Sequence, residues 1–109
     1  MSLNFLRPTE SIIRQKLIEE LSPSLLEIYN DSHLHKHHIA MKNNTNPETH
    51  FRIKIVSDHF KGHSLVSRHK IVYNLLKEEL ANGVHSLQLN TKTQQESLKE
   101  NLLLKTHNL

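Results

Sequence analysis

The chain has 109 residues, 36% of them hydrophobic, and a net charge of +3 when its ten histidines are neutral. This length fits one domain with a modest core and leaves no room for a second, catalytic domain. Cysteine is absent, which excludes disulfides, thiol catalysis and a metal site held by thiolates of this chain alone. The sequence contains no apolar run approaching the roughly 20 residues that a membrane span needs.

The first predicted element is an amphipathic helix at 9–21, with Thr9 as its expected N-cap. Pro23 should end this helix, because proline disfavours helical backbone at the residue before it. The apolar residues of the helix recur at a spacing of four, which predicts one buried face: Ile13, Leu17 and Leu21.

Two strands are predicted next, at 25–30 and 50–57. The second shows strict alternation, with Phe51, Ile53 and Ile55 separated by polar residues, so one of its faces should be solvated. The segment between them, 31–49, is rich in asparagine and histidine and long for a hairpin connection.

A turn is expected at 58–64, broken at Gly62, before a helix at 65–82 with Ser64 as its N-cap. One stripe of this helix is predicted to face the core: Leu65, His69, Val72, Leu76 and Leu80. A third strand follows at 84–90.

In that strand, His85 shares the inward side with Leu87 and Leu89, which favours a histidine satisfied within the core.

The tail from residue 93 is predicted to form a last helix. The order helix, strand, strand, helix, strand, helix predicts an α+β domain, with a three-stranded mixed sheet and helices packed on one face. We expect a single domain over 1–109, with a core at about 9–95 and a variable tail at 96–109.

The stretch "HFRIKIVSDHFKGHSLVSRHKIVYNLLKEEL", followed by "GVHSLQL", resembles the BolA family over about residues 9–95. The shared features are a strand ending in V-S, then F-x-G, R-H-[RK] opening a helix that ends in E-E-L, and V-H-[AS]-L. "NDSHLHKHH" and "PETHF" resemble the histidine-loop branch of that family. The ending "TQQESLKENLLLKTHNL" departs from the acidic and aromatic ending usual in the family, and the loop is richer in histidine.

The resemblance implies a class II KH-like fold and a non-enzymatic role in iron–sulfur cluster maturation. It implies a heterodimer with a monothiol glutaredoxin, in which the two proteins and glutathione share a 2Fe-2S cluster that the isolated chain lacks. Bacterial relatives are associated with transcriptional control, which makes nucleic-acid binding the alternative function. For a eukaryotic chain the expected compartment is the mitochondrial matrix, with the cytoplasm as alternative, and the free protein is expected to be a monomer.

Histidine ligands suit this role, because a pair of histidines can replace a pair of cysteines on one iron of a 2Fe-2S cluster. His69 is the first candidate, since the positive end of its helix favours a neutral imidazole. A histidine at the edge of the core is the competing interpretation. The second ligand is expected from His35, His38 or His50, and the sequence does not choose among them; a solvated loop is the alternative there.

His59 and His63 flank the turn glycine and are expected to be exposed. A weaker set of contacts to a partner or to nucleic acid comprises Lys61, Gly62, Arg68 and Lys70. A KH domain clamps nucleic acid with a G-x-x-G loop, and this turn contains a single glycine. H-E-x-x-H is absent, which argues against a zinc hydrolase, and histidine-rich metal storage is a further alternative.

Overall fold

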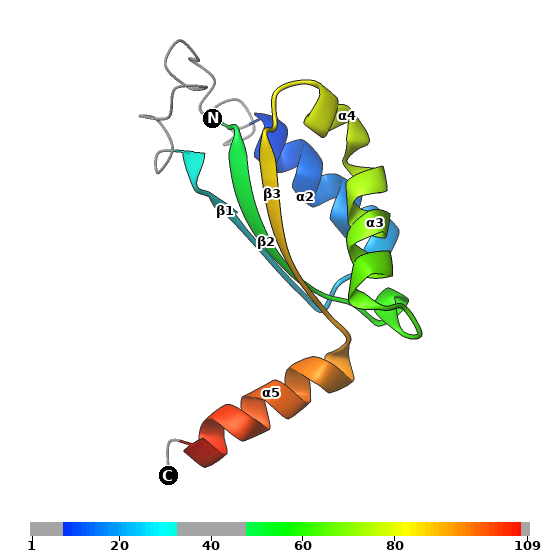
Figure 1. Ribbon diagram of the computed structural model, residues 1–109, viewed down its shortest axis with the longest axis vertical. Helices are drawn as coiled ribbons and strands as arrows, with labels where there is room; N and C mark the ends of the chain where they lie inside the picture. The colour runs from blue at the N-terminus through cyan, green and yellow to red at the C-terminus, as the bar shows by residue number, and fades with distance from the viewer. Residues whose placement is uncertain (1–7, 33–47, 108–109) are drawn as a thin grey trace.

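The computed structural model describes residues 8–32 and 48–107 and has the predicted α+β architecture (Figure 1). Its elements follow the order α2–β1–β2–η3–α3–α4–β3–α5. The predictions for His35 and His38 fall outside the described residues. None of the helices in the described ranges is long and apolar enough to cross a membrane.

Helix α2 (Pro8–Leu21) buries the predicted stripe but begins differently from the prediction. The carboxylate of Glu48 accepts the backbone N–H groups of Thr9 (3.2 Å) and Glu10 (2.8 Å). The side chain of Glu48, two residues before β2, therefore satisfies the first backbone donors of the helix, a role that was predicted for Thr9. Glu48 is 3% exposed, so this contact joins α2 to the chain just before β2.

The three strands form one mixed sheet in the order β1–β2–β3. β1 (Leu25–Asn30) pairs antiparallel with β2 (His50–Val56), as predicted for a hairpin, and β3 (Ser86–Lys92) pairs parallel with β2. β3 begins two residues later than the sequence predicts, and His50 pairs with Ser86. The starts of β2 and β3 therefore lie side by side at one end of the sheet.

The connection from β2 to β3 runs through η3 (Asp58–Phe60), α3 (Leu65–Leu75) and α4 (Lys77–Ala81). Gly62 has φ of 78°, a conformation that favours glycine, and the Ser64 side chain accepts the Ser67 N–H as predicted for an N-cap. The single helix expected at 65–82 is divided at Leu76, whose backbone leaves helical geometry (φ −104°, ψ 17°) while its side chain stays buried. Leu65, predicted to face the core, is the first residue of α3 and is 62% exposed.

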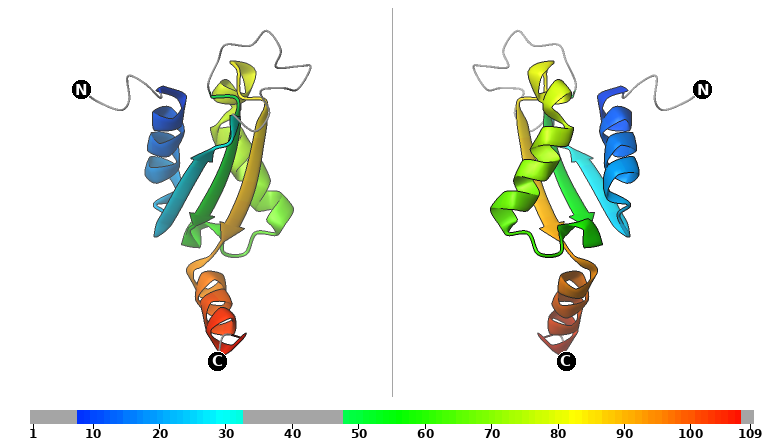
Figure 2. Two further views of the ribbon diagram at one scale, coloured as in Figure 1. Left: turned by 90° about the vertical axis from the view of Figure 1, so that its left-hand side faces the viewer. Right: turned by 90° about the vertical axis from the view of Figure 1, so that its right-hand side faces the viewer.

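Helices α2 and α3 cover the same face of the sheet, and α5 (Gln94–His107) extends from the end of β3 away from it (Figures 1 and 2). The predicted tail helix is therefore present, but it does not pack on that face. Between the sheet and the covering helices lies one cluster of buried apolar side chains: Ile13, Leu17, Leu21, Phe51, Ile53, Ile55, Phe60, Val72, Leu76, Val84 and Leu87. Such burial is the main favourable contribution to folding.

Candidate metal site

The structure separates the two described histidines that were expected to act as ligands. His50 is the first residue of β2, which then runs for seven residues, about 20 Å, away from it. Helix α3 begins near the far end of that strand (Figure 1), and His69 is only its fifth residue. His69 therefore lies nearer the opposite end of the sheet from His50, and the two do not form one site.

A different histidine lies beside His50. The ring centroids of His50 and His85 are 6.1 Å apart, with the ring planes tilted by 36°. His85 was predicted to be a core residue, and this is wrong: it precedes β3 and its side chain is exposed, while Leu87 is the first inward residue of that strand. The signal that sequence reasoning missed is register, because two parallel strands that start together bring their entry residues together.

Hydrogen bonds fix the backbone of His50. The Ser32 hydroxyl oxygen accepts the N–H groups of Thr49 (2.8 Å) and His50 (3.1 Å). Ser32 is in turn held by the Asn30 side chain, whose Oδ1 accepts the Ser32 N–H at 3.0 Å and its hydroxyl at 2.5 Å. The end of β1 therefore anchors the start of β2.

The backbone of His85 is fixed to the same point. The carbonyl oxygen of Thr49 accepts the N–H groups of His85 (2.7 Å) and Ser86 (3.2 Å). The hydroxyl of Thr49 lies 2.9 Å from Nδ1 of the His50 ring. Both histidines are thus connected through one buried threonine.

These two imidazoles suit a shared metal ion. Two imidazoles bound at about 2.0–2.1 Å to one tetrahedral ion have ring centroids roughly 5 Å apart. The 6.1 Å separation of His50 and His85 is close to that value, so the two rings could hold one ion after their side chains move. In the parts of the chain that the structure describes, no three histidine, aspartate or glutamate side chains converge on a metal-sized site.

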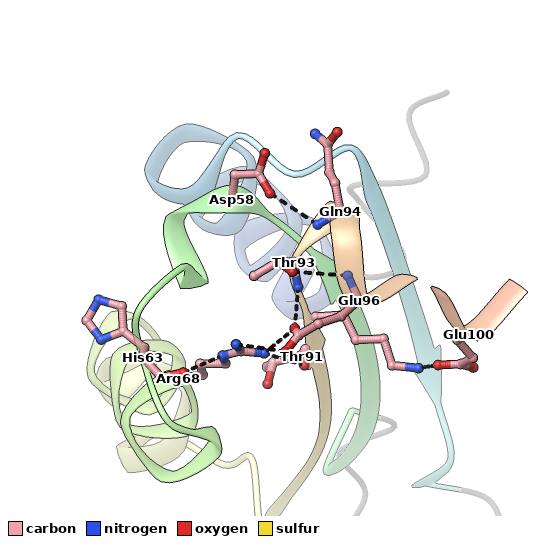
Figure 3. Close-up of polar contacts among 9 residues, drawn as sticks. Asp58, His63, Arg68, Thr91, Thr93, Gln94, Glu96 and Glu100 are labelled. Carbon is pink, nitrogen blue, oxygen red and sulfur yellow. Dashed lines mark hydrogen bonds and ion pairs between the residues drawn. The ribbon is translucent and has the colours of Figure 1, made fainter. Parts of the chain in front are cut away.

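Arg68 has a structural role, which differs from the contact predicted for it. Arg68 is 7% exposed, and its side chain makes two bonds to the Glu96 carboxylate, at 2.6 and 3.1 Å (Figure 3). It also donates to the carbonyl oxygens of His63 (2.9 Å) and Thr91 (3.3 Å). A guanidinium used in this way is not available to a phosphate.

Glu96 completes this cluster at the start of α5. Hydrogen bonds from Arg68, and then from the Thr93 N–H, lower the pKa of its carboxyl group to about 2. Thr93 accepts the Glu96 N–H in return (3.2 Å), which makes the T-x-x-E sequence a capping box that sequence analysis overlooked. The Gln94 N–H donates to Asp58 (3.1 Å), and Lys92 pairs with Glu100 (Figure 3).

The remaining predicted contact residues lie around the turn before α3. Lys61 is exposed and pairs with Asp58 at 3.6 Å, and Lys70 is exposed on α3. His59 and His63 are exposed, as predicted, and His63 Nδ1 lies 2.8 Å from the Ser67 hydroxyl. This set is at the opposite end of the sheet from the pair formed by His50 and His85.

Similar proteins agree with this fold. A chloroplastic BOLA1 protein of Arabidopsis thaliana is 49% identical over 87 residues, which are 80% of this chain and 54% of the relative. A solved structure of BolA1 from Arabidopsis thaliana matches with a TM-score of 0.71 over 79% of this chain and 92% of that one. A relative from Haemophilus influenzae, 40% identical over 84% of each chain, is named DNA-binding transcriptional regulator BolA.

The chain spans about half the length of the curated Arabidopsis thaliana relative that it matches. The family model described as BolA-like protein covers residues 17–96, from the middle of α2 to the first turn of α5. This match includes the whole sheet, both histidines of the pair and Arg68 with Glu96. The chain therefore belongs to the BolA-like family.

Proposed function

We propose that this chain is a non-enzymatic iron–sulfur adaptor, which binds a monothiol glutaredoxin and shares a 2Fe-2S cluster with it. The observation that carries the proposal is the pair of imidazoles at the start of β2 and β3, with ring centroids 6.1 Å apart. The proposed ligands of this chain are His50 and His85.

The ligand chemistry supports this role. A cluster with histidines on one iron and thiolates on the other has a higher reduction potential than one held by thiolates alone. This chain has no cysteine, so the thiolates would come from the glutaredoxin and from glutathione. An adaptor of this kind needs two neutral imidazoles that face outward and are held at a fixed spacing.

The described residues supply the exposure and the spacing that this role needs. The His85 side chain is exposed and that of His50 is half-buried, so a partner can approach both rings. Their backbones are tied together through Thr49, which limits how far the rings can separate. The face that would meet the glutaredoxin is therefore the end of the sheet where β2 and β3 begin.

The test mixes the metal-free chain with a glutaredoxin–glutathione 2Fe-2S complex and follows its visible circular dichroism. The wild-type chain should change the spectrum, because the ligands of one iron change. His50→Ala and His85→Ala should each remove most of that change. His63→Ala is the matched control, since this exposed histidine lies at the other end of the sheet, and it should behave as wild type.

The same measurement decides among the other predicted ligands. We expect His69→Ala, His35→Ala and His38→Ala to keep the wild-type spectral change. Loss of the change with His69→Ala, and its retention with His50→Ala, would overturn the proposed ligand pair and leave the partnership standing. An unchanged spectrum with the wild-type chain would contradict the partnership itself.

Nucleic-acid binding is the second candidate function, favoured by the name of the Haemophilus influenzae relative. In this chain the exposed Lys61 and Lys70 are available near the turn, whereas Arg68 is bonded to Glu96. If the chain binds DNA through these lysines, the logarithm of its affinity should fall linearly with the logarithm of salt concentration. An affinity too weak to measure, or one insensitive to salt, would exclude this function.

The compartment follows from the proposed role. We expect the mitochondrial matrix for a eukaryotic chain, where such adaptors would meet a monothiol glutaredoxin, and the cytoplasm otherwise. Fractionation of cells that express the tagged chain tests this, and recovery in a different compartment would contradict it.

A further inference from the structure

Thr49 contacts both members of the histidine pair. Its side chain is fully buried. Its carbonyl oxygen accepts the His85 N–H (2.7 Å), and its own N–H donates to Ser32 (2.8 Å). Its hydroxyl oxygen lies 2.9 Å from Nδ1 of His50.

The hydroxyl contact bears on which nitrogen of His50 can bind a metal. A neutral imidazole carries its proton on one ring nitrogen and its available lone pair on the other. Histidines that bind metals usually donate the second ring N–H to a nearby acceptor, which fixes both the tautomer and the ring orientation. Because Nδ1 is in contact with Thr49, Nε2 is the nitrogen of His50 that we assign to the metal.

The direction of this hydrogen bond decides whether the ring is ready to bind. If the Thr49 hydroxyl donated, it would occupy the lone pair of Nδ1 and the ring proton would be on Nε2. Neither nitrogen would then offer a lone pair without a rearrangement. If the hydroxyl accepts, Nδ1 keeps the proton and Nε2 has its lone pair before any metal arrives.

We propose that Thr49 is a positioning residue, whose hydroxyl accepts the Nδ1–H of His50 and so presents Nε2 as a metal ligand beside His85. The role of this hydrogen bond in metal binding rests on the proposed function. The arrangement itself is a property of the metal-free chain and can be measured without a cluster.

The experiment records the ring nitrogen shifts of His50 by NMR, in metal-free protein labelled with ¹⁵N-histidine at about pH 8, above the usual titration range of histidine. His50→Gln identifies the His50 signals by their loss. In the wild type, His50 should be in the Nδ1–H form. Thr49→Val keeps the shape of the side chain but removes the acceptor, so the His50 ring should shift toward the Nε2–H form. Thr49→Ser keeps a hydroxyl and should show the wild-type ring shifts.

Two outcomes would overturn the inference: a wild-type His50 in the Nε2–H form, or a Thr49→Val variant with wild-type ring shifts. The wild-type measurement and the serine variant decide the matter even if the valine variant does not fold. A backbone amide spectrum shows whether each variant is folded.

A second measurement connects the hydroxyl to the cluster. In the circular dichroism titration with the glutaredoxin–glutathione complex, Thr49→Val should weaken binding roughly tenfold, the effect expected for a residue that orients a ligand. Thr49→Ser should stay close to wild type. Equal binding by the valine variant would contradict the positioning role. An unchanged spectrum with the wild-type chain would instead contradict the proposed function, so the two failures are distinguishable.

Discussion

The two ends of the sheet show how differently one small domain uses its polar side chains. Where β2 and β3 begin, the His85 side chain is exposed and that of His50 is half-buried, and hydrogen bonds to Thr49 and Ser32 hold their backbones. Where the strands end, Arg68 and Glu96 are bonded to each other and to backbone groups around them (Figure 3). At the first end, a partner can reach the imidazole rings. At the second end, the charges of Arg68 and Glu96 are paired with each other and hold the start of α5 in place.

The difference shows that a charged or histidine side chain is available to a partner only if contacts within the fold do not already bury or bind it. Arg68 looks available in the sequence, in the run S-R-H-K, yet its side chain is almost completely buried. His85 looks like a core residue from its alternation with leucines, yet it is exposed. We therefore expect variants of Arg68 and Glu96 to change stability, and variants of His50 and His85 to change binding.

The strongest way to test this division is to remove Arg68. Arg68→Ala deletes the ion pair with Glu96 and the bonds to the carbonyl oxygens of His63 and Thr91. We expect the free energy of unfolding in urea to fall by about 2–3 kcal/mol, because buried acceptors lose charged donors.

Lys70→Ala is the control for this variant, since it removes a positive charge from the exposed side of the same helix. It should change stability by less than about 0.5 kcal/mol. Under conditions where Arg68→Ala remains folded, its effect on the cluster spectrum should match the wild type. Wild-type stability of Arg68→Ala would contradict the anchoring role.

A smaller effect is expected at the histidine end from Glu48, which caps α2 just before Thr49 and His50. Glu48→Gln removes the negative charge at the start of that helix and one of its two acceptor oxygens. We expect a loss of roughly 1–2 kcal/mol in the free energy of unfolding.

Glu20→Gln removes the same charge from the last turn of α2, where the helix dipole disfavours it. This control should be neutral or slightly stabilising. Equal losses from both variants would show that net charge, and not capping, is responsible.

The smallest expected effect is a dependence of the free energy of unfolding on pH, caused by Glu96 at the start of α5. The folded pKa of Glu96 is about 2, below its ordinary value of 4.5, so its contribution to stability is complete above about pH 4.5 and is lost as the pH falls toward 2. Because the Glu96 side chain is 48% exposed, solvent screening reduces this contribution to about 1 kcal/mol.

The measurement compares the free energy of unfolding of wild type and Glu96→Gln at several pH values. The wild type should be the more stable above pH 4.5, and the difference should shrink toward pH 2. A difference that is constant over this range would show that the carboxylate charge contributes nothing.

Local sequence patterns were sufficient for most of the elements. The alternation from His50 to Ile55 predicted β2 with its wet and buried sides, and Ser64 was identified as an N-cap. These features depend on neighbours a few residues apart. The prediction of Thr9 as the N-cap was wrong. The carboxylate that accepts the first backbone N–H groups of α2 belongs to Glu48, which is 38 residues beyond Glu10 in the sequence.

The sequence by itself determined the fold class, the order of the elements, the strand hairpin and the resemblance to the BolA family, because periodicity, turn residues and motifs are local. It also excluded thiolate ligands supplied by this chain, since the chain has no cysteine. Only the tertiary structure decided that His85 lies beside His50, that Thr49 connects them and that Arg68 is used by α5. The reason is register: the pairing of two parallel strands, separated by a turn and two helices, sets which distant residues meet.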